Sequence, residues 1–429
     1  MEINKYQNID ETQFSEKLDN GLEVIVVPKQ YNKTYAAFVT KFGSAVQRFI
    51  PMESSEYITV PLGVAHFLEH KVFEMEDGTD ASILLANLGA DANAFTDYGQ
   101  TAYITTSTAN TEEVINLLLD YVQEPFFNDE NVAKEQGIIT QELMMYMDKP
   151  GSRIHMGILQ NLFSKNPIRE DIVGTVKSIK SINKEILYTC YNTFYHPSNM
   201  TLVVVGNVDA EAIINLVKDN QTKKNFAKSN DIIKEMIVED NRVFKKTDTI
   251  KMDITMPKVC VGLKLPYRRY LPNELFLEDT KLRMLLELTF GPSTTTYQEL
   301  LDLEIINTGF SYNVYLDNYC GYILIQANTF KPEEFKTYIK EKLLSFAKIN
   351  IDNKEFTQMK RALLGSFIKS FNNVEFIAHG IIDYKFKNSN LFTSLDLVNN
   401  LTVNDLTPLS KYFVRKAITD FTILPKGKQ

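Results

Sequence analysis

Two of the five histidines in this 429-residue chain lie four residues apart with a glutamate between them, in the run His66-Phe67-Leu68-Glu69-His70. On a helix, residues four apart share a face, and their Cβ atoms lie about 5–6 Å apart. Two imidazoles so placed can hold one zinc ion, and Glu69 projects beside them, where a general base accepts a proton from a water molecule. This is the H-x-x-E-H pattern. We therefore expect a helix at residues 63–74 to be the element around which the fold is organised.

A histidine pair on a helix can also be a surface accident. Apolar neighbours of the pair predict that this helix is largely buried: Ala65, Phe67, Leu68, Val72 and Phe73. A buried polar cluster is costly unless a metal or a polar partner satisfies it. The run therefore favours a metal site, with zinc expected first and manganese or cobalt as alternatives for the same ligands.

A zinc ion held by two histidines needs a third protein ligand and leaves its fourth position to water. Residues 129–147 predict a long helix that carries Glu135 and Glu142. These carboxylates are seven residues apart, which is about two turns, so they lie on one face. Either could be the ligand, and the other would then orient a ligand or the water. Spacing alone does not choose between them.

Short sequence motifs predict the strands and helices on either side of the histidine helix. Asn20-Gly21, within residues 16–41, predicts a β-hairpin. Pro61 suits the first turn of the histidine helix. Asn110 with Glu113 predicts a capping box at the start of another helix.

Two short antiparallel strands are predicted at residues 90–96 and 101–106, joined by a turn at 97–99. Ala92 and Ala94 are small enough to let another backbone approach. The pair could be a sheet edge offered to an extended peptide, or an ordinary internal hairpin. The sequence leaves both readings open.

Composition excludes some classes of function. The length of 429 residues predicts two to three domains, and a hydrophobic content of 44% is sufficient for their cores. The net charge of −8 argues against a nucleic-acid partner. Residues 1–7 lack the apolar core of a signal peptide, and no apolar run is long enough to span a bilayer. Cys190, Cys260 and Cys320 are far apart and odd in number, which predicts buried, reduced thiols in a cytoplasmic protein.

The pairing of the histidine motif with Glu135-x6-Glu142 resembles the M16 (pitrilysin, or inverzincin) zinc metallopeptidases, which include mitochondrial processing peptidase. The run Asn93-Ala94-Phe95-Thr96 matches the substrate-strand segment of that family. The run Tyr195-His196-Pro197-Ser198-Asn199-Met200, with the apolar stretch to Gly206, matches another of its signatures. The likeness covers nearly the whole chain and is greatest to short bacterial M16B proteins of the processing-peptidase or peptide-antibiotic-maturation type.

The resemblance implies a role for each candidate residue. His66, His70 and Glu142 would be the zinc ligands, Glu69 the general base and Glu135 a supporting carboxylate. Substrate would add as a strand beside Asn93, Ala94, Phe95 and Thr96. The implied fold is α+β, with two homologous domains of antiparallel-rich sheet flanked by helices, forming half of a clamshell around the substrate.

The second half of the chain repeats the predicted order of the first. Charged, weakly periodic residues at 221–247 predict a linker between an N-terminal catalytic domain, 1–220, and a C-terminal domain, 248–429. The repeated order indicates an internal duplication. Its elements are predicted as strands near 248–256 and 259–264, helices at 275–289 and 295–303, two strands within 308–328, helices at 331–349 and 352–371, and a last strand near 413–424.

In that duplication Arg283, Leu286 and Glu287 take the places of the first histidine, the glutamate and the second histidine. The C-terminal domain therefore cannot hold the same metal site.

The family often places an arginine, and a tyrosine seven residues later, in the second half of a subunit to grip substrate. Phe310-Ser311-Tyr312 lies in the tyrosine region, but residues 284–360 contain no arginine, and Leu303 and Ile305 hold the corresponding places. A homodimer would lack this arginine too. We therefore expect a different M16-like partner subunit that supplies the Arg/Tyr pair.

The leading hypothesis is a zinc-dependent endopeptidase that hydrolyses peptides or small unfolded polypeptides, as the catalytic subunit of a two-chain enzyme. The main alternative is a non-catalytic M16-like scaffold or assembly subunit, which has no physical reason to keep a costly polar cluster. A metal-sensing or metal-storage protein would explain the ligands but would leave Glu69 without a role.

Overall fold

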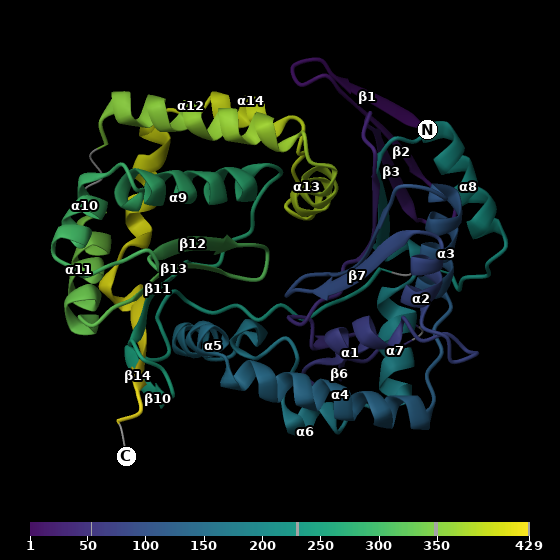
Figure 1. Ribbon diagram of the computed structural model, residues 1–429, viewed down its shortest axis with the longest axis horizontal. Coiled ribbons are helices and arrows are strands. Elements are labelled where there is room, and N and C mark those ends of the chain that lie inside the picture. The colour runs from purple at the N-terminus through teal and green to yellow at the C-terminus, as the bar shows by residue number, and fades with distance from the viewer. Residues whose placement is uncertain (53, 229–230, 347–350, 428–429) are drawn as a thin grey trace. The chain divides into compact units, whose positions relative to one another are not determined.

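The structure is a computed structural model that describes residues 1–52, 54–228, 231–346 and 351–427 (Figure 1). It divides into two compact units, each built on a mixed β-sheet with helices. Unit 1 comprises Met1–Leu143, Asp171–Glu235 and Ile368–Lys385, and unit 2 comprises Met144–Glu170, Met236–Phe367 and Phe386–Gln429. The predicted α+β class is confirmed.

Unit 1 contains a seven-stranded sheet in the order β1-β2-β3-β9-β4-β8-β7. Its strands are β1 (Glu2–Tyr6), β2 (Glu11–Lys17), β3 (Glu23–Pro28), β4 (Thr34–Thr40), β7 (Ala90–Thr96), β8 (Thr101–Ser107) and β9 (Met200–Gly206), and β5 (Arg48–Phe49) pairs separately with β6 (Ile58–Thr59). Its helices are α1 (Val64–Lys71), α2 (Ala81–Asn87), α3 (Thr111–Gln123), α6 (Val176–Ile179), α7 (Lys184–Phe194), α8 (Ala210–Thr222) and α13 (Val374–Phe386). The central strands β4 and β9 are buried along their whole length, as expected for apolar runs covered on both faces.

Unit 2 contains a five-stranded sheet in the order β10-β14-β11-β13-β12. Its strands are β10 (Thr247–Met252), β11 (Lys258–Lys264), β12 (Ser311–Leu316), β13 (Gly321–Asn328) and β14 (Ile418–Pro425). Its helices are α5 (Pro150–Leu162), α9 (Glu274–Phe290), α10 (Thr295–Asp302), α11 (Pro332–Ser345) and α14 (Ser394–Asn399). Two long helices, α4 (Asp129–Asp148) and α12 (Asn353–Ser370), each contribute residues to both units.

The two sheets repeat one topology. In unit 1, β3 pairs parallel with β9, and then β9, β4, β8 and β7 pair antiparallel in turn. In unit 2, β10 pairs parallel with β14, and β14, β11, β13 and β12 pair antiparallel in the same sequence. The helix pairs α1–α2 and α9–α10 occupy the same place in each order. The structure therefore shows the duplicated architecture that the order of elements predicts.

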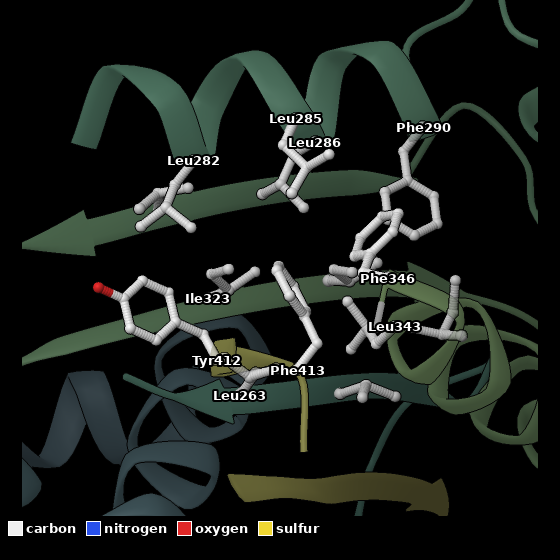
Figure 2. Close-up of a cluster of buried hydrophobic side chains, with 14 of the residues drawn as sticks. Leu263, Leu282, Leu285, Leu286, Phe290, Ile323, Leu343, Phe346, Tyr412 and Phe413 are labelled. Atoms are coloured by element: carbon white, nitrogen blue, oxygen red, sulfur yellow. The ribbon is translucent and has the colours of Figure 1, made fainter. Parts of the chain in front are cut away.

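The core of unit 2 contains α9, the helix that takes the place of α1 in the repeated order. Figure 2 shows α9 above the sheet, with Leu282, Leu286 and Phe290 among its buried side chains. They pack with Leu263 of β11 and Ile323 of β13. Leu286, the counterpart of Glu69 in the sequence comparison, is 1% exposed. An apolar core in this unit thus occupies the position of the polar cluster in the other.

The compact units do not follow the predicted division into 1–220 and 248–429 throughout. Residues 144–170 belong to unit 2, where Gly157 packs against the Phe421 ring so closely that a Cβ would meet it at 2.2 Å. Residues 368–385, with most of α13, belong to unit 1. The predicted linker, 221–247, contains the boundary between units at Glu235 and Met236.

Two local predictions are wrong. Pro61 does not lie in the first turn of α1, because the helix begins at Val64 after Gly63, whose φ is 87°. Asn110 forms no side-chain cap for α3, because its own backbone is left-handed and its amide donates to the Leu88 carbonyl. The predicted helix end near residue 349 lies outside the described residues.

The predicted burial of Cys190, Cys260 and Cys320 is confirmed, and none of the three forms a disulfide. Among the described helices, none is both long enough and apolar enough to cross a lipid bilayer.

One carboxylate within the predicted linker is tied firmly to unit 2. Glu239 accepts hydrogen bonds from the backbone N–H groups of residues 164–166 and from Lys264, whose side chain is 2% exposed. Burial alone would raise the pKa of Glu239, but these donors outweigh it and lower the pKa to about 2. This carboxylate joins the 144–170 segment to the sheet of unit 2.

We expect Glu239→Gln to lower the free energy of unfolding of unit 2 by about 3 kcal/mol at pH 7, because it leaves Lys264 buried without its charge partner. The pKa of Glu239 lies below its ordinary value of 4.5, so the unfolded chain binds this proton first. The stabilisation is therefore complete above about pH 4.5 and is lost as pH falls toward 2. Urea unfolding of both proteins across this range measures the difference, which should shrink with acidification.

Glu235→Gln is the matched control, because its partner Arg48 and Glu235 itself are both well exposed. Exposed pairs contribute about 0–1 kcal/mol. An equal loss in both variants would contradict the assigned role of Glu239.

Candidate metal centre

Helix α1 is short and almost entirely enclosed. Every residue of α1 except His70 is buried, including His66 and Glu69. The helix can start where it does because Gly63 adopts a positive φ, and a Cβ there would meet the Val173 carbonyl oxygen at 2.3 Å. Only glycine tolerates both conditions. The chain therefore holds the histidine pair on a fixed, buried turn.

Three predicted ligands converge from two helices. The Nε2 atoms of His66 and His70 lie 3.7 Å and 3.5 Å from Oε2 of Glu142 on α4. The potential ligand atoms of these three residues all lie within 4.8 Å of one another. Among the described residues, these three form the group that could hold a metal ion. The imidazole ring centroids are 4.6 Å apart. Both nitrogens therefore face the same carboxylate oxygen.

The donor set fits a divalent cation such as zinc. Oε2 of Glu142 is buried and has no hydrogen-bond partner within the described structure. A buried carboxylate oxygen that faces two ring nitrogens without a shared proton is costly. Two imidazole nitrogens and one carboxylate are a common three-ligand set for zinc in catalytic sites. A cation between these three atoms would remove the cost.

Glu135 has a different environment from Glu142, although both lie on α4. Its Oε1 atom is 3.0 Å from Nδ1 of His70. An ionised carboxylate can only accept, so Nδ1 donates and the Nε2 lone pair of His70 is directed toward Glu142. Such an outer carboxylate commonly fixes the tautomer and orientation of a metal-binding histidine. The geometry thus separates the two glutamates that spacing alone left equivalent.

The pKa values of the two imidazoles shift in opposite directions, although burial lowers both. Burial, and then the nearby His70, lower the pKa of His66 to about 3, so His66 is neutral at pH 7. Burial alone would also lower the pKa of His70, but the hydrogen bond to Glu135 and the surrounding carboxylates raise it. One candidate ligand therefore has a free lone pair at neutral pH, and the other must first release a proton when it is charged.

Glu69 lies beside the cluster and is held by β7. The hydroxyl of Thr96, the last residue of β7, donates to Oε2 of Glu69 at 2.6 Å. Burial raises the pKa of the Glu69 carboxyl, against the lowering effects of this hydrogen bond and of His70. A carboxyl with a raised pKa is suited to accept and return a proton near neutral pH.

The predicted substrate strand is the outer strand of its sheet. In the strand order of unit 1, β7 stands at one end and pairs only with β8 among the described strands. Residues 90–96 therefore form an edge strand of this sheet. Along this edge the Ala94 N–H donates to the side chain of Asn93, and the Phe95 ring lies 5.6 Å from the His379 ring.

Sequence reasoning missed several supports of the site. Tyr103 donates to the Leu68 carbonyl of α1, and its hydroxyl lies 2.9 Å from that of Tyr195. Both tyrosines are nearly or fully buried. Tyr195 begins the run that matches a family signature, so its position carried a signal, whereas nothing in the sequence distinguished Tyr103. The other histidines, His155, His196 and His379, lie outside the cluster.

Comparison with known proteins agrees with this architecture. Residues 57–176 match the family described as Insulinase (Peptidase family M16), and residues 181–363 match Peptidase M16 inactive domain. An uncharacterized zinc protease of Bacillus subtilis (strain 168), YmfH, is 39% identical over 425 residues and covers 99% of each chain.

Solved structures show the same fold. An M16-like peptidase from Alicyclobacillus acidocaldarius has a TM-score of 0.93 and 31% identity, over 97% of this chain and 99% of that one. The periplasmic protease PqqL from Escherichia coli has a TM-score of 0.74 and 17% identity, over 99% of this chain and 48% of that one. The second likeness concerns the fold alone.

We expect the purified chain to bind one zinc ion and Glu142→Gln to lose most of its affinity, because an amide oxygen carries no charge. Glu135→Gln should weaken binding by about 10- to 100-fold, as is typical when a partner of a ligating histidine is removed. Competition with a chromophoric chelator measures both affinities.

Glu130→Gln, on the exposed first turn of the same helix, is the control and should bind zinc like the unaltered chain. Equal affinity in the Glu142 and Glu130 variants would show that the cluster is not the metal site.

Proposed function

The chain belongs to the M16 family of metalloproteases, and from this premise we propose that it is a zinc-dependent endopeptidase that cleaves peptides or small unfolded polypeptides. The observation that carries the proposal is the convergence of His66, His70 and Glu142 around one point, with Glu69 beside them. The proposed ligands are these three residues, and the proposed base is Glu69.

Zinc bound by these residues would act as a Lewis acid that lowers the pKa of water and polarises a carbonyl. The chain's own groups supply the rest. Glu69 accepts a proton from the attacking water and returns it to the leaving amine. Glu135 holds the His70 ring through Nδ1. The enclosure of α1 keeps bulk water from the carboxylates, which strengthens their electrostatic effect.

We assign substrate binding to the free edge of β7. An extended peptide that adds to an edge strand gains main-chain hydrogen bonds, which select for extended conformation more than for sequence. Asn93, Ala94, Phe95 and Thr96 form the end of this edge nearest to Glu69, because Thr96 contacts that glutamate directly. A peptide bound along this edge would extend toward the carboxylate of Glu69. This placement supports unfolded or short substrates over folded ones.

A second M16-like chain is part of the proposal, and the contacts within unit 2 support it. Arg283 is bound to Asp279 through two of its nitrogens and also donates to the Val314 carbonyl. The Tyr312 hydroxyl donates to Glu287 at 2.6 Å. Residues 284–360 contain no arginine, so we propose that the arginine that grips substrate comes from another chain.

Two alternatives are less well supported. A non-catalytic scaffold has no use for a buried cluster in which His66 and Glu135 are each 8% exposed. A metal-storage protein has no use for a buried glutamate held beside the cluster by a separate strand. We also propose a cytoplasmic location, supported by three buried, free cysteines.

Glu69→Gln should abolish peptide cleavage while zinc remains bound. The amide keeps the shape of the side chain but cannot accept a proton, and loss of a general base costs about 10²- to 10⁴-fold in rate. Hydrolysis of a quenched fluorescent peptide, together with metal analysis of the same sample, measures both effects.

Glu76→Gln is the control, because this exposed glutamate lies a few residues after α1. A metal-storage role predicts no cleavage by either protein. Cleavage by the Glu69 variant at the rate of the control would exclude Glu69 as the base.

The chain alone should cleave peptides about 100-fold more slowly than its mixture with an M16-like protein from the same organism, because one missing donor at a developing charge costs roughly this much. Peptidase assays of each chain and of the mixture, with size-exclusion chromatography, test this. Full activity of the chain alone would contradict the need for a partner.

A further inference from the structure

We propose that the Thr96 hydroxyl is a positioning group that fixes the Glu69 carboxylate, so that one strand both receives the peptide and aligns the base. This inference rests on the proposed function, because it gives Thr96 a role in the proton transfer assigned to Glu69. The resemblance to M16 proteins assigns residues 93–96 to substrate binding and does not single out this hydroxyl.

The first support is the contact itself. Thr96 Oγ1 donates to Glu69 Oε2 at 2.6 Å, across 27 positions of sequence. Within the described part of the chain, this is the hydrogen bond that reaches the Glu69 side chain. Glu69 as a residue is 9% exposed, so water cannot easily replace the donor. Hydrogen bonds to a charged group are about twice as strong as neutral ones. Removing the hydroxyl therefore frees the carboxylate to rotate.

The second support is the position of Thr96 opposite Thr101 on the neighbouring strand β8. Thr96 faces Thr101 across the β7–β8 pair, and their Oγ1 atoms lie 3.2 Å apart. Thr101 is fully buried and donates its own proton to the Phe42 carbonyl at 2.9 Å. Its hydroxyl therefore does not donate to Thr96, and the single Thr96 proton goes to the nearer and charged acceptor, Glu69 Oε2 at 2.6 Å. The direction of the donor is thus set by two strands of the sheet.

The third support is the alternation of β7. Side chains of a strand point to opposite faces in turn, so Ala92, Ala94 and Thr96 share the face that contacts α1. The two alanines leave room beside the helix, and Thr96 is the residue of the three that can donate a hydrogen bond from its side chain. Phe95 belongs to the other face, where its ring contacts His379.

A consequence for catalysis follows from this arrangement. The backbone of β7 would set the register of a peptide, and the side chain of its last residue sets the position of the base. Reaction rates are sensitive to displacements of about 1 Å between reacting groups. Loss of the hydroxyl should therefore reduce turnover, whereas main-chain binding of the peptide and binding of zinc should change little.

The experiment compares Thr96→Val with Thr96→Ser. Valine keeps the shape and strand preference of threonine without the donor, and serine keeps the donor. We expect Thr96→Val to lower kcat by about 10- to 100-fold with KM nearly unchanged, as for other outer residues that orient a reacting group. Thr96→Ser should recover most of the lost turnover. Zinc content should equal that of the unaltered chain in both variants.

Crystal structures of the two variants provide a readout that does not depend on activity. Glu69 should leave its present position in Thr96→Val and keep it in Thr96→Ser. Thr106→Val is the control, because Thr106 lies on β8 and its side chain points to the face opposite Thr96; it should change neither kcat nor the position of Glu69.

The outcomes separate the two proposals. If the unaltered chain and its Glu69→Gln variant cleave no peptide with or without a partner, the proposed function fails, and the structures still decide whether Thr96 positions Glu69. If the unaltered chain is active and Thr96→Val retains its kcat, or if Glu69 stays in place without the hydroxyl, the positioning role is overturned. A rise in KM at constant kcat would also overturn it, since that result assigns Thr96 to substrate binding alone.

Discussion

The site depends on one electrostatic constraint. Inside unit 1, the Nε2 atoms of His66 and His70 face a Glu142 oxygen at 3.7 and 3.5 Å, and that oxygen has no donor within the described structure. Lone pairs and negative charge gathered in a buried place repel one another, and the low local dielectric makes this repulsion large. A cation placed between these groups attracts each of them, and this attraction outweighs their mutual repulsion. The apolar packing around α1 and the glycine that starts it are therefore conditions for a metal site rather than independent features.

The duplication shows what happens when this constraint is removed. The five strands of the unit 2 sheet have the same order, and the same pattern of parallel and antiparallel pairs, as five of the seven strands in the unit 1 sheet. In unit 2, Leu286 is buried in an apolar core, and Arg283 pairs with Asp279. A helix at this position of the fold therefore packs without a buried His/Glu cluster, although α9 buries other polar residues such as Glu278 and Asp279. The polar cluster of α1 is not required by the architecture, which is why its presence in unit 1 indicates a function.

The sequence predicted most of the elements and the convergence of the ligands. These predictions rested on short-range sequence patterns that do not depend on tertiary contacts. The patterns are the H-x-x-E-H spacing, the two strands around the turn at residues 97–99, and the repeated order of elements in the second half. The start of α1 could not be predicted from Pro61, because the contact of Gly63 with the Val173 carbonyl joins residues far apart in sequence.

The different contacts of Glu135 and Glu142 could not be predicted either, because they too depend on residues far apart in sequence. The two residues share a helical face, and only the tertiary position of His70 separates them. The exchange of residues 144–170 and 368–385 between the units also depends on long-range packing, such as that of Gly157 against Phe421. The hydrophobic periodicity of the sequence predicts which face of an element is buried, but it does not predict which of the two units covers that face.

The two histidines are not equivalent, and this asymmetry bears on how the site would take up a metal. Burial lowers the pKa of His66 to about 3, so this ring offers a lone pair throughout the neutral range. Glu135 and the other carboxylates raise the pKa of His70 against the effect of burial, so a cation competes with a proton there. Metal binding to such a site releases that proton and is favoured as pH rises. Glu135 thus has two effects on His70: its hydrogen bond leaves Nδ1 as the donor, and it raises the pKa of the ring, so that binding of a cation there depends on pH.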